Sequence, residues 1–205
     1  MKLEYREFVL ELRADENEKK LRGYAAVFDK LSENLGGFRE KIAKGAFAKT
    51  IEKADVRLLI NHEGLPLART KSHTLALAED DEGLRFEADL DLTDPDVQRI
   101  IPKLRRKDLN QMSFGFYTVS DKWEHPSEKS TKESIRTLLE VDLYDISLVT
   151  YPAYPQTSAS VRSAQEIYDS YLASLRAQDE AIKAEQRQAL EAQRERQIKL
   201  WRYMT

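Results

Sequence analysis

The stretch Asn110–Thr118, NQMSFGFYT in one-letter code, decides how the rest of the fold is interpreted. Successive side chains of a β-strand point to opposite faces, so this stretch predicts a strand with two unlike faces. The apolar face carries Met112, Phe114 and Phe116. We expect that face to pack against a core, which leaves the hydroxyl of Ser113 on the open side of the strand.

A serine hydroxyl on an open strand face has two interpretations. It can be a nucleophile if a base lies within reach. Gly115 follows two residues later on the same face and has no side chain, so another backbone could approach there. The plain alternative is a polar residue on a solvated face, which suits the surface preference of serine. Ser113 alone does not decide between them.

Composition limits the classes of protein that the chain can belong to. Its 205 residues, 41% hydrophobic and 34% charged, suffice for one domain or one domain with an appendage. A net charge of -3 argues against a nucleic-acid partner. The absence of cysteine excludes disulfides, thiolate zinc sites and a cysteine nucleophile. No long apolar run or signal peptide is present, which predicts a soluble, cytoplasmic protein without a membrane partner.

Short segments of strand-like sequence dominate the chain up to Pro155. Residues 3–12 and 21–29 predict a strand pair, and 74–78 and 84–90 predict a hairpin. The other predicted strands are 56–61, 110–118, 135–142 and 143–150. Short helices are expected after Gly45 and after Asp94, the second bent or ended by Pro102. The predicted fold class is α+β: a mainly antiparallel β-barrel with flanking short helices.

The sequence changes character after Pro155, because residues 156–205 contain neither glycine nor proline. Alanine, glutamine, glutamate and arginine dominate there, which predicts one long helix. Hydrophobic residues recur every seven positions at Val161, Tyr168, Leu175, Ile182 and Ala189. We therefore expect a barrel domain at 1–157 and a helical arm at 158–205. The arm is either a solvated extension or a helix for self-association or partner binding.

Three histidines are candidates for a base, and His62 is the best placed. It ends the predicted strand 56–61 and precedes a turn, whereas His73 and His125 lie in polar, loop-like sequence. A half-buried polar role is the plain alternative for a histidine at a strand end. No histidine pair has the spacing of a metal motif, so we predict no metal and no cofactor. One histidine with carboxylates could still bind a metal, although no pattern calls for it.

Two carboxylates are candidates for orienting that imidazole. Glu140 interrupts the apolar run Leu138–Val141, where a carboxylate tends to be paired. Asp145 belongs to the next predicted strand. A solvent-facing acid on an edge strand is the alternative for Glu140, so residue chemistry leaves the third position open.

Several motifs together resemble a known family. They occur in the order found in the prohead (capsid maturation) proteases of HK97-like tailed phages, and the resemblance covers about residues 20–158. The motifs are Gly23–Phe28, Gly45–Phe47, Asn61–Glu63, Met112–Phe116 and Ile146–Pro155.

This resemblance implies a fold and a set of roles. The family is similar to the herpesvirus assemblins, which are β-barrel serine proteases with helices around the barrel. The resemblance implies that Ser113 is the nucleophile, that His62 is the base, and that Glu140 orients the imidazole, with Asp145 in reserve. The herpesvirus enzymes use a second histidine instead, but no histidine follows His125 here.

The resemblance also implies a function: a serine endopeptidase that cleaves the scaffolding segment of the phage major capsid protein, and itself, through an acyl-enzyme. The expected partners are the capsid protein and its scaffolding segment, and the expected location is the assembling prohead in the host cytoplasm. A catalytically inactive capsid-assembly protein of the same fold is the main alternative. A metal-dependent hydrolase centred on His62 is the third.

Overall fold

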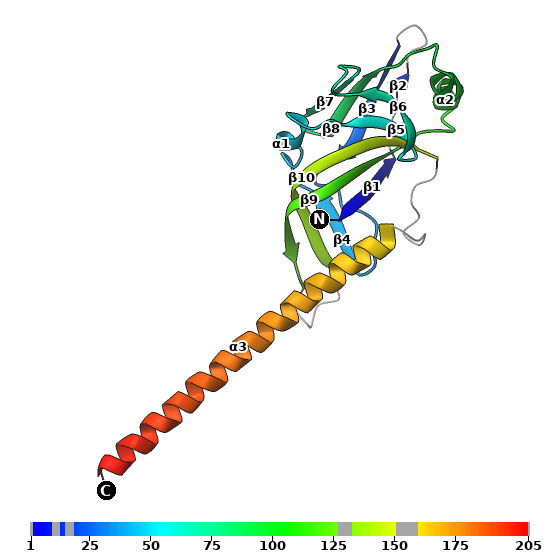
Figure 1. The fold of residues 1–205 in the computed structure, drawn as a ribbon. Coiled ribbons are helices and arrows are strands. Elements are labelled where there is room, and N and C mark those ends of the chain that lie inside the picture. The colour runs from blue at the N-terminus through cyan, green and yellow to red at the C-terminus, as the bar shows by residue number, and fades with distance from the viewer. Residues whose placement is uncertain (1, 10–12, 15–18, 127–132, 151–159, 205) are drawn as a thin grey trace. The chain divides into compact units, whose positions relative to one another are not determined.

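The computed structural model describes residues 2–9, 13–14, 19–126, 133–150 and 160–204 (Figure 1). The chain divides into two compact units, residues 1–165 and 166–205. The predicted domain boundary at 157/158 lies outside the described residues.

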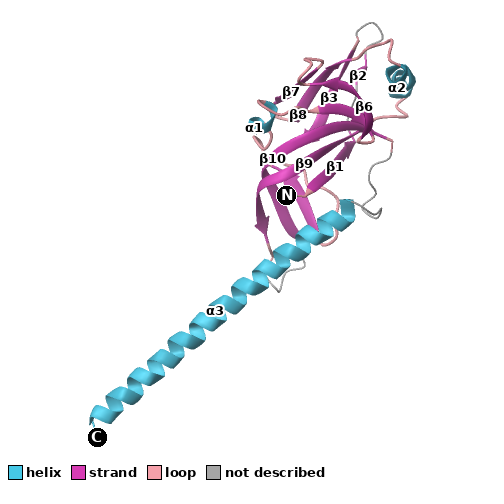
Figure 2. Ribbon diagram, in the orientation of Figure 1, coloured by secondary structure: helices cyan, strands magenta, loops and turns pink. Residues whose placement is uncertain are grey.

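The first unit consists mostly of strands, with two short helices (Figure 2). The strands before the second helix are β1 (Leu3–Val9), β2 (Arg13–Ala14), β3 (Lys20–Val27), β4 (Phe38–Ile42), β5 (Arg57–Ile60), β6 (Glu63–Arg69), β7 (Leu75–Glu79) and β8 (Gly83–Asp89). The two strands after it are β9 (Gln111–Glu124) and β10 (Ser134–Val149). The helices are α1 (Ala48–Ile51) and α2 (Pro95–Arg105).

The strands form two sheets. The larger has the order β1-β9-β10-β5-β6, with β4 also paired to β10, and the smaller has the order β2-β3-β8-β7. The mixed α+β prediction and the hairpin of β7 and β8 are confirmed. The predicted pairing of the first two strands is wrong, because β1 pairs with β9 and β3 pairs with β8. Among the described strands no pairing closes the sheets into one barrel, so the closed barrel stays a prediction.

Strand β9 has the apolar face that alternation predicts, but the predicted open face is wrong, because Ser113 and Gly115 are buried as well. Met112, Phe114 and Phe116 have no exposed surface, which confirms the apolar face. The Phe114 ring stacks on Phe116 with centroids 4.9 Å apart and meets Phe47, next to α1, edge-on at 5.5 Å. This packing fixes the core face of β9 and therefore sends Ser113 to the opposite face.

Strand β10 is one long strand, where the sequence predicted two. It follows β9 antiparallel along its length, with register shifts between Leu138 and Val141 and between Leu143 and Asp145. A β-bulge inserts a residue and exchanges the faces to which later side chains point. The shift before Asp145 brings that residue and Ser147 onto the face of Ser113, because they pair with Gly115 and Ser113.

Helix α2 begins where the sequence predicts and continues beyond the predicted break. The Asp94 side chain caps the helix by accepting a 2.8 Å hydrogen bond from the Asp96 amide, and Pro95 occupies the first turn. Pro102 does not end the helix, which runs on to Arg105. The apolar side chains of Val97, Ile100 and Leu104 are buried on one face, so their packing outweighs the hydrogen bond that proline cannot donate.

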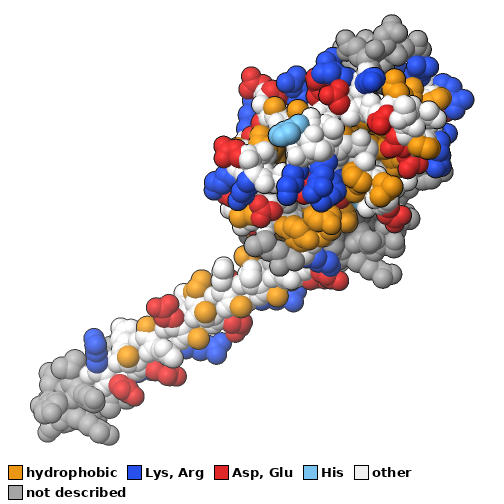
Figure 3. Space-filling view, turned by 45° about the horizontal axis from the view of Figure 1, so that its top comes forward, with side chains coloured by type: hydrophobic (Ala, Val, Ile, Leu, Met, Phe, Trp, Pro, Cys, Tyr) orange, Lys and Arg blue, Asp and Glu red, His pale blue; other side chains and the backbone are white. Residues whose placement is uncertain are grey.

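The second unit is almost entirely helix α3 (Ser160–Met204), which confirms the helical prediction for this part of the chain. At about 1.5 Å per residue, its 45 residues extend over about 68 Å. Hydrophobic, acidic and basic side chains are interspersed along its surface (Figure 3). Ile182 and Leu190 are each more than half exposed. None of the helices in the described ranges is long and apolar enough to cross a membrane.

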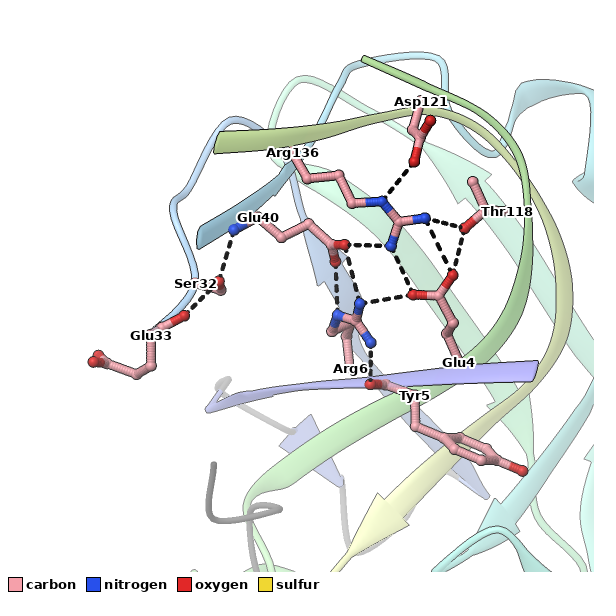
Figure 4. A network of polar contacts seen from close by, with 9 residues as sticks. All are labelled: Glu4, Tyr5, Arg6, Ser32, Glu33, Glu40, Thr118, Asp121 and Arg136. Carbon is pink, nitrogen blue, oxygen red and sulfur yellow. Dashed lines mark hydrogen bonds and ion pairs between the residues drawn. The ribbon is translucent and has the colours of Figure 1, made fainter. Parts of the chain in front are cut away.

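A buried cluster of charged residues joins β1 to the neighbouring strands on the core side (Figure 4). Two arginines and two glutamates alternate in it: Glu4, Arg6, Glu40 and Arg136. Arg6 Nε lies 2.7 Å from Glu40 Oε1, and Arg136 Nη1 lies 2.7 Å from Glu4 Oε2. Asp121 receives a further hydrogen bond from Arg136 at 2.6 Å. The cluster therefore holds the edge strand β1 against β4, β9 and β10.

Replacing Arg136 with methionine is expected to destabilise the protein by about 3–5 kcal/mol. The change leaves Glu4 and Glu40, each 3% exposed, to share one arginine in a dry environment. Urea unfolding at pH 7 measures the effect. Arg39→Met is the matched control, because the Arg39–Glu133 pair is about 40% exposed and contributes at most about 1 kcal/mol. Equal losses of stability in the two variants would contradict the conclusion that the buried cluster stabilises the protein more than an exposed ion pair does.

Candidate active site

His62 is presented by a tight turn between two strands. Asn61 and His62 form the two-residue connection between β5 and β6, and both have positive φ, at 52° and 61°. This is the backbone of a type I′ hairpin, which favours Asn-Gly. A histidine at the glycine position costs about 1–3 kcal/mol, so the surrounding structure must hold it.

The end of β10 holds this turn in place. The Asn61 amide donates to the carbonyl of Leu148 at 2.8 Å. The Asn61 side chain accepts from the Thr150 amide at 2.9 Å and donates to its hydroxyl at 3.1 Å. The strained turn is therefore fixed to the same strand that carries Asp145 and Ser147.

The imidazole of His62 contacts a hydroxyl on one side and a carboxylate on the other. Its Nε2 lies 2.6 Å from Ser113 Oγ, and its Nδ1 lies 2.5 Å from Asp145 Oδ1. An ionised carboxylate only accepts hydrogen bonds, so Nδ1 carries the hydrogen and Nε2 is left to accept one. This is the arrangement in which an imidazole can take a proton from a serine hydroxyl.

Of the two candidate carboxylates, the structure brings Asp145 to the imidazole and leaves Glu140 away from it. Glu140 is paired with Ser120 in the register, seven residues from the Ser113–Ser147 pair, or roughly 23 Å at about 3.3 Å per residue. Its carboxylate binds Lys49 at 2.7 Å near the surface. The sequence could not show this, because the bulge before Asp145 changes the face to which the acid points.

The sequence suggested that a backbone could approach Gly115, but the described atoms nearest to it belong to side chains. A Cβ at this position would lie 2.8 Å from the Tyr5 ring and 3.2 Å from Asp145 Oδ2. The Tyr5 ring also packs against the imidazole, with centroids 4.3 Å apart. Burial and the nearby charge of Asp145 raise the pKa of Tyr5, which keeps its hydroxyl neutral. Gly115 thus lets Tyr5 and Asp145 enclose the imidazole.

Ser147 is a buried hydroxyl that links the residues of the site. It pairs with Ser113 across β9 and β10 and has no exposed surface. Its Oγ accepts from the backbone amide of His62 at 3.1 Å and lies 3.3 Å from Asp145 Oδ1. Ser147 therefore contacts both His62 and Asp145 and helps to hold them in place.

Ser147→Ala is expected to lower kcat by about 10–100-fold with little change in KM. A small displacement of a reacting group costs about this much, while substrate contacts stay in place. Steady-state kinetics on a cleavable peptide would separate the two constants, and Ser147→Thr, which keeps the hydroxyl, should recover part of kcat. A fall in thermal stability with kcat unchanged would mean that Ser147 is only structural.

Glu7 is a second acid on this face. It pairs with Ser113 across β1 and β9, and its Oε2 is buried without a hydrogen-bond partner among the described residues. Burial raises the pKa of Glu7 from 4.5 to about 7. The electrostatic effect of His62 lowers this pKa, but by less than burial raises it. The side chain therefore gains and loses its proton near neutral pH.

Glu7→Gln is expected to gain stability relative to the native protein as pH rises. Below pH 4.5 the glutamate is protonated in the folded and the unfolded chain, so its burial carries no charge penalty. Between pH 4.5 and about 7 the unfolded chain ionises first, and the native protein loses stability with rising pH. Because Glu7 keeps partial solvent contact, the full difference is about 1–2 kcal/mol. Urea unfolding at pH 4 and pH 8 measures the difference in stability between Glu7→Gln and the native protein. The same difference at both pH values would contradict the prediction.

The nucleophile candidate lies beneath its neighbours. Ser113 has no exposed surface, whereas His62 is 15% exposed and Glu7 and Gln111 are each partly exposed. In the described part of the chain no three histidine, aspartate or glutamate side chains are grouped as metal ligands.

Comparison with known proteins identifies one family. A sequence model described as caudovirus prohead serine protease matches residues 8–170, which is more than half of the chain and includes His62, Ser113 and Asp145. No curated protein and no solved structure matches the chain.

Proposed function

Since the chain belongs to the caudovirus prohead serine protease family, we propose that it cleaves capsid protein during prohead maturation, with Ser113 as nucleophile, His62 as base and Asp145 as the orienting carboxylate. The family indicates a serine protease in general and a role in capsid maturation. The residue roles are supported by the two short contacts that His62 makes, one from each ring nitrogen.

The proposed reaction is peptide-bond hydrolysis through an acyl-enzyme. His62 Nε2 removes the proton of the Ser113 hydroxyl as Oγ attacks the scissile carbonyl carbon, and then protonates the leaving amine. A water molecule activated by the same nitrogen attacks the ester, and the proton returns to Ser113. Asp145 holds the hydrogen on Nδ1 and stabilises the imidazolium that forms in each half of the reaction.

The proposed substrate is the scaffolding segment of the major capsid protein, with the protease itself as a second substrate. The family places the reaction inside assembling proheads in the host cell. Helix α3 is proposed to act outside the site, in association with another copy or with the scaffold. Its exposed Ile182 and Leu190 and its mixed charges are compatible with that role.

An inactive assembly protein of the same fold is the second candidate function, supported by the complete burial of Ser113. Against it stands the geometry of the site: a strained turn at His62 and a carboxylate buried beside its Nδ1 are costly arrangements to retain without chemistry.

Labelling with a fluorophosphonate tests the proposal directly. The purified full-length chain is treated with the probe, and the modified residue is identified by mass spectrometry. Co-expression with the cognate capsid protein, followed by intact-mass measurement, reports cleavage. We expect the label on Ser113 and a shortened capsid protein, both insensitive to chelator. A chain that processes the capsid protein while Ser113 stays unlabelled, or that loses activity to EDTA, would contradict the proposal.

A further inference from the structure

In the described part of the chain, three buried side-chain oxygens have no hydrogen-bond partner, and one of them, Asp145 Oδ2, belongs to the carboxylate that contacts His62. The other two are Glu7 Oε2 and Gln111 Oε1. Buried polar atoms are nearly always satisfied, and an exception calls for an explanation such as a missing ligand. We refer to these two oxygens as the acceptor pair.

The acceptor pair lies beside the nucleophile on the substrate-facing side of the sheet. Glu7 pairs with Ser113 across β1 and β9, and Gln111 precedes Ser113 by two residues on β9. Because cross-strand partners and residues two apart share one face, both side chains project on the same face as the hydroxyl. The mechanism proposed above uses neither of them.

Gln111 lies on the side of Ser113 away from the imidazole, and Glu7 lies level with Ser113 on the neighbouring strand. The imidazole contacts Asp145 and Tyr5, and both of these residues pair with Gly115, the residue two after Ser113. The imidazole therefore approaches the hydroxyl from the Gly115 end, and Gln111 lies at the other end. Since the leaving amine must sit next to the imidazole, the residue that supplies the scissile carbonyl extends past Glu7 toward Gln111.

The carboxylate of Glu7 favours the binding of a positively charged group at this site. Among the described residues no lysine or arginine forms an ion pair with Glu7, and His62 is the one group whose electrostatic effect lowers the pKa of Glu7. Burial of an unpaired carboxylate is unfavourable, as the raised pKa of Glu7 shows, and a positive charge placed beside it would relieve that cost. An ammonium or guanidinium group carries several donors and can serve two acceptors on neighbouring strands at once.

We propose that Glu7 and Gln111 form a specificity subsite that binds the side chain of a lysine or arginine on the acyl side of the scissile bond. This inference rests on the proposed protease function. Glu7 supplies the charge, and the amide oxygen of Gln111 supplies a second, neutral acceptor. The same subsite disfavours an acidic side chain, which would place two carboxylates side by side.

The test uses one peptide from the processed capsid sequence, with the residue before the cleaved bond changed to lysine, arginine, norleucine, glutamine or glutamate. Norleucine matches the lysine stem without its charge. Cleavage is measured at pH 8, where Glu7 is mainly ionised. We expect kcat/KM to be about 10–100-fold higher for lysine than for norleucine, since a hydrogen bond to a charged group contributes about 1.5–3 kcal/mol.

Glu7→Gln is the decisive variant, because glutamine keeps the size and removes the charge. It should bring the lysine-to-norleucine ratio of kcat/KM to within about threefold. Gln111→Glu, which adds a second carboxylate, should raise the ratio. Glu63→Gln is the matched control, since it removes an exposed carboxylate next to His62 and should leave the ratio unchanged.

Binding to a Ser113→Ala background separates this inference from the protease function. Fluorescence anisotropy with the same peptides should show tighter binding of the lysine peptide, and the difference should vanish when Glu7→Gln is added. That result supports the subsite even if no peptide is cleaved. Equal cleavage and equal binding of the lysine and norleucine peptides, or a preference for lysine that persists in Glu7→Gln, would overturn the subsite and leave the proteolytic function standing.

Discussion

Ser113→Ala is expected to lower the rate of capsid protein cleavage by about 10⁴- to 10⁶-fold, the largest effect of any single change in this chain. The substitution removes the atom that forms the acyl-enzyme and leaves the fold nearly intact, because the buried Cβ stays in place. His62→Ala should cost about as much, since the hydroxyl is a weak nucleophile without its base. The rate is measured on purified unprocessed capsid protein by intact mass over time.

The double variant makes this prediction sharper. Ser113 and His62 act as one unit, so removing both should cost no more than removing either. Independent contributions would multiply instead. Ser120→Ala, an exposed serine on the same strand β9, is the matched control and should cleave at the native rate. Undiminished cleavage by Ser113→Ala would show that the nucleophile lies elsewhere.

The buried residues of the core could be predicted from the local sequence pattern, but the pairing of the strands could not. Alternation predicted the apolar face of β9, and all three of its predicted core residues are fully buried. The same reasoning paired β1 with β3, although β1 adds to the edge of the other sheet. Alternation says which face is buried but does not identify the partner strand, which depends on packing between residues far apart in sequence.

A residue of the candidate site could be predicted where the nearby sequence marks its position, such as the end of a strand or a turn. His62 was identified by its position at a strand end before a turn, and the structure places it beside Ser113. The roles of Tyr5, Glu7 and Ser147 were missed. Tyr5 and Glu7 enter the site only because β1 pairs with β9, and Ser147 does so only because of the bulge in β10. Alternation in β1 gave the opposite signal, because the charged Glu4 and Arg6 are the residues that the structure buries.

The charged cluster behind β1 has a consequence for the site. Glu4 and Arg6 lie on the core side of the strand, and Tyr5 and Glu7 lie on the side of the nucleophile. A change that weakens the cluster therefore loosens the strand that carries one wall of the site. Destabilisation at Arg136 should consequently be accompanied by weaker catalysis, although Arg136 contacts none of the reacting groups.

Asp145→Asn is expected to lower the cleavage rate by about 10³- to 10⁴-fold with the fold unchanged. Asparagine has nearly the same size, but its amide can donate a hydrogen bond to Nδ1 of His62. When Nδ1 accepts this hydrogen bond, the ring hydrogen moves to Nε2. Nε2 is the nitrogen that must accept the Ser113 proton, so His62 is held in the wrong tautomer. It also removes the negative charge that stabilises the imidazolium.

Glu140→Gln is the control that separates the two acids considered from the sequence. It removes one carboxylate from the same strand, but that carboxylate binds Lys49 and not His62, so cleavage should continue at the native rate. Both variants are compared by rate on the same capsid substrate and by thermal unfolding, which excludes misfolding of Asp145→Asn as the cause. The outcome fatal to the assignment is the reverse pattern, a large loss in Glu140→Gln beside near-native cleavage in Asp145→Asn. Because the two acids differ in the face that the bulge gives them, this pair of variants also tests in solution the register of β10.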